Sequence, residues 1–300
     1  MMTTTVPSEG PVLNMTSLIG ADNPAVLRIL LGAQLRRLRE AKRITLENAG
    51  NVIRASHSKI SRLESGRVAF KDRDIVDLFI HYGVTDQEQI ETLRKVAVRA
   101  NSRGWWQDYS DILPPWFEEY ISLEEAAVRI SGYEVQFVPG LLQTEEYARA
   151  VTLLSYSNPK EIGRRVSLRM ARQSRLSGAE PVSLGMVLDE GALSRPIGGP
   201  SVMRAQLAHL IEMAQRPNVT IQVLPFNVGG HAAAGGPFSV LHFAESDLSD
   251  IVFLEQLTTA QYLEKPDLVR SYLTVMERLR TEASTPEDSL RRLRAILSAF

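Results

Sequence analysis

The chain has 300 residues, of which 44% are hydrophobic and 23% are charged, and its formal net charge is −1. This composition predicts a soluble globular protein that is long enough for two domains. The sequence has no cysteine, which excludes disulfides, thiolate metal sites and cysteine nucleophiles and is compatible with a reducing cytoplasm. No apolar run approaches the roughly 18–20 residues that a membrane-spanning helix needs.

The N-terminal segment has no basic stretch followed by an apolar one, so it does not resemble a signal peptide. We expect residues 1–24 to form a disordered tail.

The small net charge hides an uneven distribution. The segment from Arg28 to Arg73 has twelve Lys and Arg against four Asp and Glu, so it carries +8 and the remainder of the chain carries −9. A basic module on an acidic body is typical of a protein that binds nucleic acid phosphates. A solvated basic surface without a partner is the alternative that charge alone leaves open.

The first predicted helix spans residues 25–41. Leucines recur in it at helical spacing and define one buried stripe: Leu27, Leu30, Leu31, Leu35 and Leu38. Three arginines are expected on its other faces: Arg36, Arg37 and Arg39.

Two short helices follow. Thr45 is the predicted N-cap of the second helix, with Leu46, Ala49 and Ile53 facing inward. After a short connection at residues 54–55, Ser56 is the predicted N-cap of the third helix. Gly66 is a natural end for that helix, because a left-handed residue costs glycine little. Two helices joined by a tight turn predict a helix-turn-helix.

The third helix has the chemistry that entry into the major groove of DNA requires. Ile60 and Leu63 point toward the scaffold, whereas the opposite side has small polar and basic residues. Its N-terminal end offers free backbone N–H groups that favour phosphate. Arg62 can give two parallel hydrogen bonds to O6 and N7 of guanine. Ser61 and Arg62 lie one turn after Ser58 on the same side of the helix, so this side is left free to contact DNA.

Two more helices complete the N-terminal module. Apolar spacing predicts a fourth helix from Ile75, Leu78, Phe79 and Tyr82, and a fifth over residues 86–99. We therefore place a DNA-binding domain at residues 25–100. Residues 101–115 begin an aromatic segment that holds all three tryptophans within twelve residues, and we assign them as a linker. Clustered aromatics pack on a second domain or mark an interface or ligand pocket.

This module resembles the five-helix DNA-binding domain of the XRE (Cro/cI-like) regulators. The resemblance rests on LGAQLRRLREAKRITLENAGNVIRASHSKISRLESGRVAF with the following DRDIVDLFIHYGV, and the run SHSKISRLESGR is its most specific part. It implies that the start of the third helix contacts bases, through His57, Ser58, Ser61 and Arg62. It also implies that Glu64 is structural and that Arg67 and Lys71 lie in a loop that touches the DNA backbone. The second helix departs from the family at Leu46, where a polar residue is usual, and at Arg54, where Gly is frequent. We assign phosphate contacts to Thr45, Arg54, Ser56, Lys59, Arg67 and Lys71.

The second half predicts an α+β domain with a small mixed sheet, over residues 116–300. Helices are expected near 116–131, 143–156, 160–177, 200–216, 265–283 and 287–299. Strands near 184–189 and 219–224 flank a helix, which predicts parallel neighbours. Segments 238–243 and 250–256 predict a hairpin. The last helix has an apolar face that docks on its own domain or pairs with another copy.

One helix of this half is unusually rich in arginine. It contains Arg164, Arg165, Arg169, Arg172 and Arg175. A second surface that faces phosphate is one interpretation, and a solvated face whose arginines pair with the acidic body is the other.

This half is similar to the uncharacterised C-terminal domain that is fused to such modules in actinobacterial regulators. The resemblance rests on LEEAAVRISGYEVQFVPGLLQTEEYARA, the arginines around 169–176, and PNVTIQVLPF with GGPFSVLHF. It implies a small protein partner encoded nearby, and links to development and antibiotic regulation.

The sequence shows no enzyme signature, and we expect no catalytic residue, no cofactor and no metal. The five histidines lie at positions 57, 81, 209, 231 and 242, and none forms a metal-binding motif. The glycine-rich run 229–236 lacks a phosphate-loop lysine, and is either a lid over a pocket or a plain connection. The adjacent acids at 124–125 and 189–190 point to different sides of the chain and make no facing pair.

We therefore expect a sequence-specific transcriptional regulator that binds double-stranded DNA as a homodimer. It is expected in the cytoplasm, associated with the nucleoid, with no membrane partner. Its C-terminal domain would dimerise, sense a ligand or dock a small protein. The alternative is an antitoxin-like or adaptor protein in which DNA binding is secondary or lost.

Overall fold

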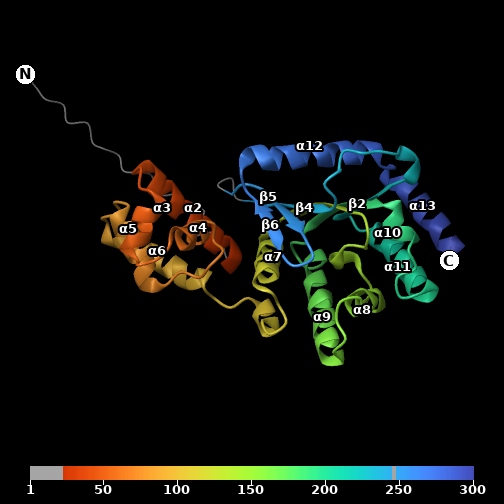
Figure 1. The fold of residues 1–300 in the computed structure, drawn as a ribbon, viewed down its shortest axis with the longest axis horizontal. Helices are drawn as coiled ribbons and strands as arrows, with labels where there is room; N and C mark the ends of the chain where they lie inside the picture. The colour runs from red at the N-terminus through yellow and green to blue at the C-terminus, as the bar shows by residue number, and fades with distance from the viewer. Residues whose placement is uncertain (1–22, 245–247) are drawn as a thin grey trace, which may run out of the picture. The chain divides into compact units, whose positions relative to one another are not determined.

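The structure is a computed structural model that describes residues 23–244 and 248–300. The predicted disordered tail lies almost wholly outside these residues. The described residues fall into two compact units, one ending at Trp105 and the other beginning at Trp106 (Figure 1). Each unit is described below by itself.

The first unit is helical, as predicted. Its helices are α2 (Pro24–Ala41), α3 (Leu46–Val52), α4 (His57–Glu64), α5 (Asp72–His81) and α6 (Gln87–Ala100). Polar side chains start four of them, because a hydroxyl, amide or carboxylate oxygen accepts hydrogen bonds from backbone N–H groups in Asn23, Thr45, Ser56 and Asp86. The predicted leucine stripe of α2 is buried. It meets Ile60 and Leu63 of α4 and the apolar faces of α5 and α6 in one core.

The second unit is built on a six-stranded mixed sheet with the order β3-β2-β1-β4-β5-β6. The strands are β1 (Arg129–Glu134), β2 (Ser183–Asp189), β3 (Val219–Leu224), β4 (Phe238–His242), β5 (Ile251–Glu255) and β6 (Ala260–Leu263). β1, β2 and β3 are parallel neighbours, and β4, β5 and β6 continue the sheet in antiparallel pairs. The predicted crossover from β2 to β3 and the predicted hairpin of β4 and β5 are both confirmed.

Helices cover this sheet. They are α7 (Pro115–Ala126), α8 (Glu145–Leu153), α9 (Pro159–Arg172), α10 (Glu190–Ser194), α11 (Pro200–Met213), α12 (Pro266–Glu282) and α13 (Pro286–Ala299). Figure 1 shows α12 along one side of the sheet, with α7, α8 and α9 on the other. Between α12 and the sheet lies an apolar core that includes Tyr133, Val187, Val240, Met276 and Leu279.

Two parts of this unit were predicted wrongly. The helix expected at 116–131 ends at Ala126, and β1 starts at Arg129 in the centre of the sheet. The four residues from Ile130 to Tyr133 are all buried, so β1 lacks the alternation that announces a half-exposed strand. The short strand β6, which pairs with β5, was not predicted at all. Its four residues are only partly buried or exposed, so they leave little pattern.

The last helix docks within its own unit. α13 contacts α11 and β3, and Leu293 is fully buried. Ser289 Oγ accepts a hydrogen bond of 2.9 Å from the backbone N–H of Val223. Of the two roles that the sequence left open for this helix, docking on its own domain is the one observed.

Candidate nucleic-acid interface

The turn between α3 and α4 is tight because of two unusual backbone positions. The N–H of Ala55 donates to the carbonyl of Gly50 over 2.9 Å. A Cβ atom at Gly50 would lie 2.4 Å from the carbonyl oxygen of Ala55, so only glycine allows this approach. Arg54 adopts φ +54°, a left-handed conformation that favours glycine. Glycine would adopt this conformation without strain.

Helix α4 has one face for packing and another for solvent. Ile60 and Leu63 are 0% and 1% exposed. The side chains predicted to contact bases are all exposed, and they lie along the first two turns: His57, Ser58, Ser61 and Arg62. The predicted division of α4 into a buried and an exposed face is confirmed. A polar surface of this kind on the second helix of a helix-turn-helix is what can enter a major groove.

The N-termini of α3 and α4 are capped by hydroxyl oxygens. Thr45 Oγ1 accepts from the N–H of Asn48 over 3.1 Å, and Ser56 Oγ accepts from the N–H of Lys59 over 3.3 Å. A hydroxyl that accepts in this way keeps its own proton, which remains available to donate. Both exposed caps can therefore hydrogen-bond a phosphate oxygen while they hold the helix ends.

The predicted phosphate-binding cations differ in their surroundings. Arg54 and Lys71 are exposed, as is Arg62, and none of the three forms an ion pair among residues 23–244 and 248–300. Lys59 is different, because its Nζ lies 2.7 Å from Asp74 Oδ2 in a half-buried pair. Arg67 is half-buried and has a partner of its own. Lys59 must leave Asp74, or share its charge, to contact a phosphate.

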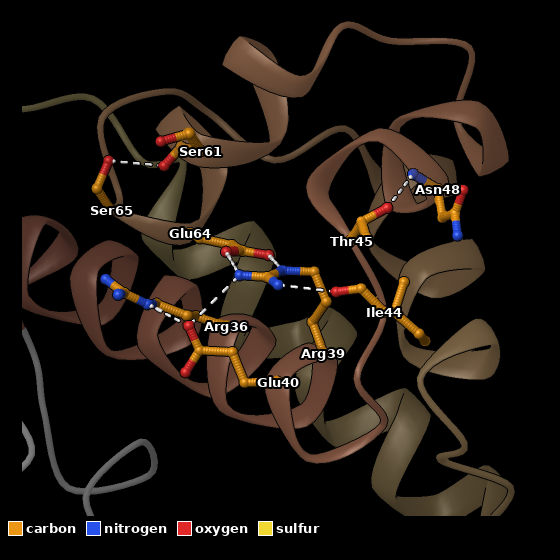
Figure 2. Close-up of polar contacts among 9 residues, drawn as sticks. All are labelled: Arg36, Arg39, Glu40, Ile44, Thr45, Asn48, Ser61, Glu64 and Ser65. Atoms are coloured by element: carbon orange, nitrogen blue, oxygen red, sulfur yellow. Dashed lines mark hydrogen bonds and ion pairs between the residues drawn. The ribbon is translucent and has the colours of Figure 1, made fainter.

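A buried ion pair fixes α4 to α2. Arg39 Nε and Nη2 donate to the two carboxylate oxygens of Glu64 over 2.6 and 2.9 Å, and Arg39 Nη1 donates to the carbonyl of Ile44 (Figure 2). The expected position of Arg39 on an outer face of its helix is wrong, because the residue is only 9% exposed. Glu64 is structural, as the resemblance implied. Sequence spacing could not separate Arg39 from its exposed neighbour Arg36, which pairs with Glu40 at the surface.

This pair has an energetic consequence for the interface. Removing one partner of a buried pair leaves an unpaired charge and costs about 3–5 kcal/mol. The hydrogen bond with Glu64 raises the pKa of Arg39 further, so the guanidinium stays charged. Tyr82 lies near both groups, and burial raises the pKa of its hydroxyl well above the usual value. The base of α4 is thus held by charge as well as by packing.

The end of α4 is fixed by Gly66. This residue has φ +69°, and a Cβ atom on it would lie 2.7 Å from the Cα atom of Ile29 in α2. Gly66 therefore ends the helix, as predicted, and also permits a close approach of α2.

Comparison with known families agrees with this geometry. A family model described as "Helix-turn-helix domain" matches residues 30–93. A second model, described as "Domain of unknown function (DUF5753)", matches residues 117–295, more than half of the chain. The chain belongs to the DUF5753 family. The search of curated proteins and the search of solved structures gave no match.

The arginine-rich helix of the DUF5753 region is α9, and its arginines point into the unit. Arg172 makes a buried bidentate pair with Glu124 of α7, with both distances 2.7 Å. Arg164 pairs with Asp111, and Arg165 pairs with Glu161 and lies 3.7 Å from the centre of the Tyr156 ring. Arg169 donates to Gln143 and Arg175 to the carbonyl of Ala127, so three of the five arginines pair with acidic groups as the second interpretation expected, but all five are at least partly buried and do not form the solvated face that it described.

The stretch VPGLLQT of the DUF5753 region is held by buried amides. Gln143 Nε2 donates to the carbonyl of Val138 over 2.6 Å. Gln206 of α11 bonds both Leu142 and Thr144, and Tyr147 accepts from the N–H of Val138. These contacts make the segment a rigid junction between helices and sheet.

The glycine-rich loop of the DUF5753 region is tied to the sheet by one histidine. His231 Nε2 lies 3.1 Å from the hydroxyl of Tyr133, which also donates to Asp189 over 3.4 Å. Asp189 caps α10, whereas Glu190 accepts from the N–H of Phe226 and pairs with Arg292. The two adjacent acids have separate structural partners, as their position in the sequence predicted.

Most of the aromatic segment, which precedes the DUF5753 match at residue 117, belongs to the second unit from Trp106 onward. Trp106 is buried, and the rings of Trp116, Phe117 and Tyr120 follow one another to Phe253 of β5. No helix among the described residues is long and apolar enough to span a membrane. In the same part of the chain, no three His, Asp or Glu side chains are grouped so that they could hold a metal ion.

Proposed function

We propose that this protein is a sequence-specific DNA-binding transcriptional regulator of the XRE type, like those of actinobacteria, that inserts α4 into the major groove. The observation that supports the proposal most strongly is the exposed polar face of α4, held rigidly by the buried pair of Arg39 and Glu64. A fixed helix with a free polar face is what base recognition requires.

The proposal divides the contacts between two groups. Base edges are contacted by His57, Ser58, Ser61 and Arg62. Phosphates are contacted by Thr45, Arg54, Ser56, Lys59, Arg67 and Lys71. Because phosphate contacts position the protein and base contacts specify the sequence, loss of the two groups has different effects.

The proposal also covers the whole molecule. Residues 25–100 are the DNA-binding domain, residues 101–115 an aromatic linker, and residues 116–300 a domain that dimerises and binds a small protein or a ligand. A homodimer places two copies of α4 in successive major grooves of a near-palindromic operator, about 34 Å apart. The protein acts in the cytoplasm, at the nucleoid, and performs no catalysis.

The experiment is a binding selection. The full chain is incubated with a random duplex pool at about 150 mM salt, a concentration at which non-specific phosphate binding is weak, and the retained DNA is sequenced. We expect a short inverted repeat with half-sites about one helical turn apart. Lys95→Ala, which removes an exposed charge from α6, is the matched control and is expected to select the same repeat.

Unselective retention that disappears with added salt would contradict the proposal. It would favour the alternative, an adaptor or antitoxin-like protein whose helix-turn-helix docks another protein.

A further inference from the structure

The end of the sheet where β1 begins has an unusual set of cations under α12. Arg280 of α12 reaches down to the sheet, and its Nη2 donates to Ser131 Oγ over 2.9 Å. Ser131 pairs in register with Gly185 of the neighbouring strand β2. A Cβ atom at Gly185 would lie 2.9 Å from Arg280 Nη2. Two small residues on adjacent strands therefore make the space in which this guanidinium lies.

A second arginine lies on the same face. Arg129 is two residues before Ser131 in β1, so both side chains leave the strand on the side of α12. Two residues of a strand span about 7 Å, a separation over which two guanidinium groups can both contact one oxyanion. Arg129 is exposed and Arg280 is half-buried, so a small molecule can approach from solvent.

The side chain next to the guanidinium of Arg129 is a poor hydrogen-bond acceptor for it. Its Nη2 lies 3.3 Å from Nδ1 of His242, the residue opposite it in β4. The same Nδ1 lies 2.8 Å from Asp250 Oδ2. A ring nitrogen that donates to Asp250 has no lone pair for Arg129. The Nη2 group of Arg129 thus faces another donor when this nitrogen donates to Asp250.

Neither arginine has a carboxylate partner within 4.0 Å among the described residues, in contrast to Arg172 beneath the opposite face. Asp250 is engaged by His242, and Glu277, one turn before Arg280 on α12, is exposed. Burial and the nearby charge of Arg129 lower the pKa of Arg280. Two like charges that lie close together without a carboxylate within 4.0 Å cost free energy, of which the charge of Glu277 offsets only a part, and functional sites are among the places where folds tolerate such a cost.

We propose that Arg129 and Arg280 bind an oxyanion, the phosphate or carboxylate group of a small ligand. Guanidinium groups bind both groups through paired N–H donors. Ser131 and Gly185 act as positioning residues that hold Arg280 in place. This inference rests on the proposed role of the C-terminal domain in ligand binding, and its test needs no DNA, so the two can fail separately.

The test is calorimetric titration of the full chain with inorganic phosphate, and separately with acetate, at constant ionic strength. We expect one saturable site per chain for at least one of the two anions. The anion that binds more tightly indicates whether the ligand presents a phosphate or a carboxylate group. Arg129→Ala and Arg280→Ala should each lower the affinity for this anion by about tenfold or more. Arg278→Ala is the matched control, because Arg278 is exposed on another side of α12 and should leave binding unchanged.

Two further variants keep the test decisive. Arg280→Lys retains the charge but loses the two-pronged donor set, so it should fold and still bind more weakly. Ser131→Ala should weaken binding without a change of charge. Absence of saturable binding by the wild type, or equal affinity in Arg278→Ala and Arg280→Ala, would overturn the proposal. So would a loss of DNA affinity in Arg280→Ala without phosphate, because the cluster would then be a nucleic-acid contact.

Discussion

Two cations one turn apart on α4 differ in what they can do. Lys59 is held by Asp74 at 2.7 Å, whereas Arg62 is exposed and makes no ion pair among the described residues. The sequence could assign both to the same basic face, but it could not reveal that α5 brings an aspartate to one of them. At the scale of the residue, Arg62 is therefore the stronger candidate for a direct contact with a base.

Arg54 is expected to strain the backbone of the turn and to contact a phosphate of the DNA. In the left-handed conformation of φ +54° a non-glycine residue is strained by about 1–2 kcal/mol. Arg54→Gly should therefore leave the stability of the first unit unchanged, or raise it by up to about 1 kcal/mol. Loss of a phosphate contact should lower the affinity for all DNA sequences and reduce the salt slope by about one.

Thermal unfolding and DNA titration at several salt concentrations check both parts. A clear loss of stability would contradict the account of the turn. An unchanged salt slope would remove Arg54 from the interface.

At the scale of the element, the position of α4 depends on the turn before it and the pair beneath it. The capping residues, the buried stripe of α2 and the end of α4 at Gly66 were predictable, because each has a local signal in the sequence. The resemblance implied the structural role of Glu64, but the sequence did not reveal Arg39 as its partner, because the two residues are 25 positions apart. β1 was missed since a strand buried on both faces resembles the end of an apolar helix.

Two glycines inside helices are predicted to respond oppositely to the same change. Gly163 in α9 has nothing within 4 Å of an added Cβ atom, so Gly163→Ala should stabilise its helix by about 1 kcal/mol. Gly50→Ala should destabilise α3 and α4, because the new Cβ atom would lie 2.4 Å from a carbonyl oxygen. Amide hydrogen exchange of the full chain measures both locally, with slower exchange expected in 159–172 and faster exchange in 45–64. Slower exchange in both segments would show that the turn adapts to a side chain.

At the scale of the whole molecule, charge is distributed unevenly along the chain. The segment from Arg28 to Arg73 carries +8 and the remainder −9, so the cations concentrate where DNA is proposed to bind. In the second unit, by contrast, three arginines of α9 pair with acidic groups of the same unit, and the pair of Arg172 with Glu124 is buried. Composition predicted two domains and this asymmetry, but the direction of each arginine in α9 required the structure.

The stability of the second unit should depend on pH through Glu134. Burial, with the nearby charge of Glu255, raises the pKa of Glu134 from 4.5 to about 8. The folded chain therefore keeps a proton that the unfolded chain loses, so stability falls as pH rises from about 4.5 to about 8. His242, whose pKa is lowered by burial, has the opposite effect, but only below its unfolded value of 6.5.

Between pH 6.5 and 7.5, Glu134 should lower the free energy of unfolding of the wild type by at most about 1.4 kcal/mol, and Glu134→Gln should remove this decrease. Urea unfolding followed by the fluorescence of the three tryptophans, two of which lie in the second unit, measures it. Glu146→Gln, at an exposed position of α8, is the control. Parallel pH dependence in the wild type and Glu134→Gln would contradict this assignment.

The most direct measurement of the central claim, that α4 recognises bases, is the affinity of Arg62→Ala for the selected operator and its single base-pair variants. We predict a loss of about 1–3 kcal/mol on the operator and a loss of discrimination at one base pair only. Lys71→Ala should weaken binding to every sequence alike and reduce the salt slope by about one. If Arg62→Ala kept both the affinity and the sequence preference of the wild type, α4 would not be the element that recognises DNA.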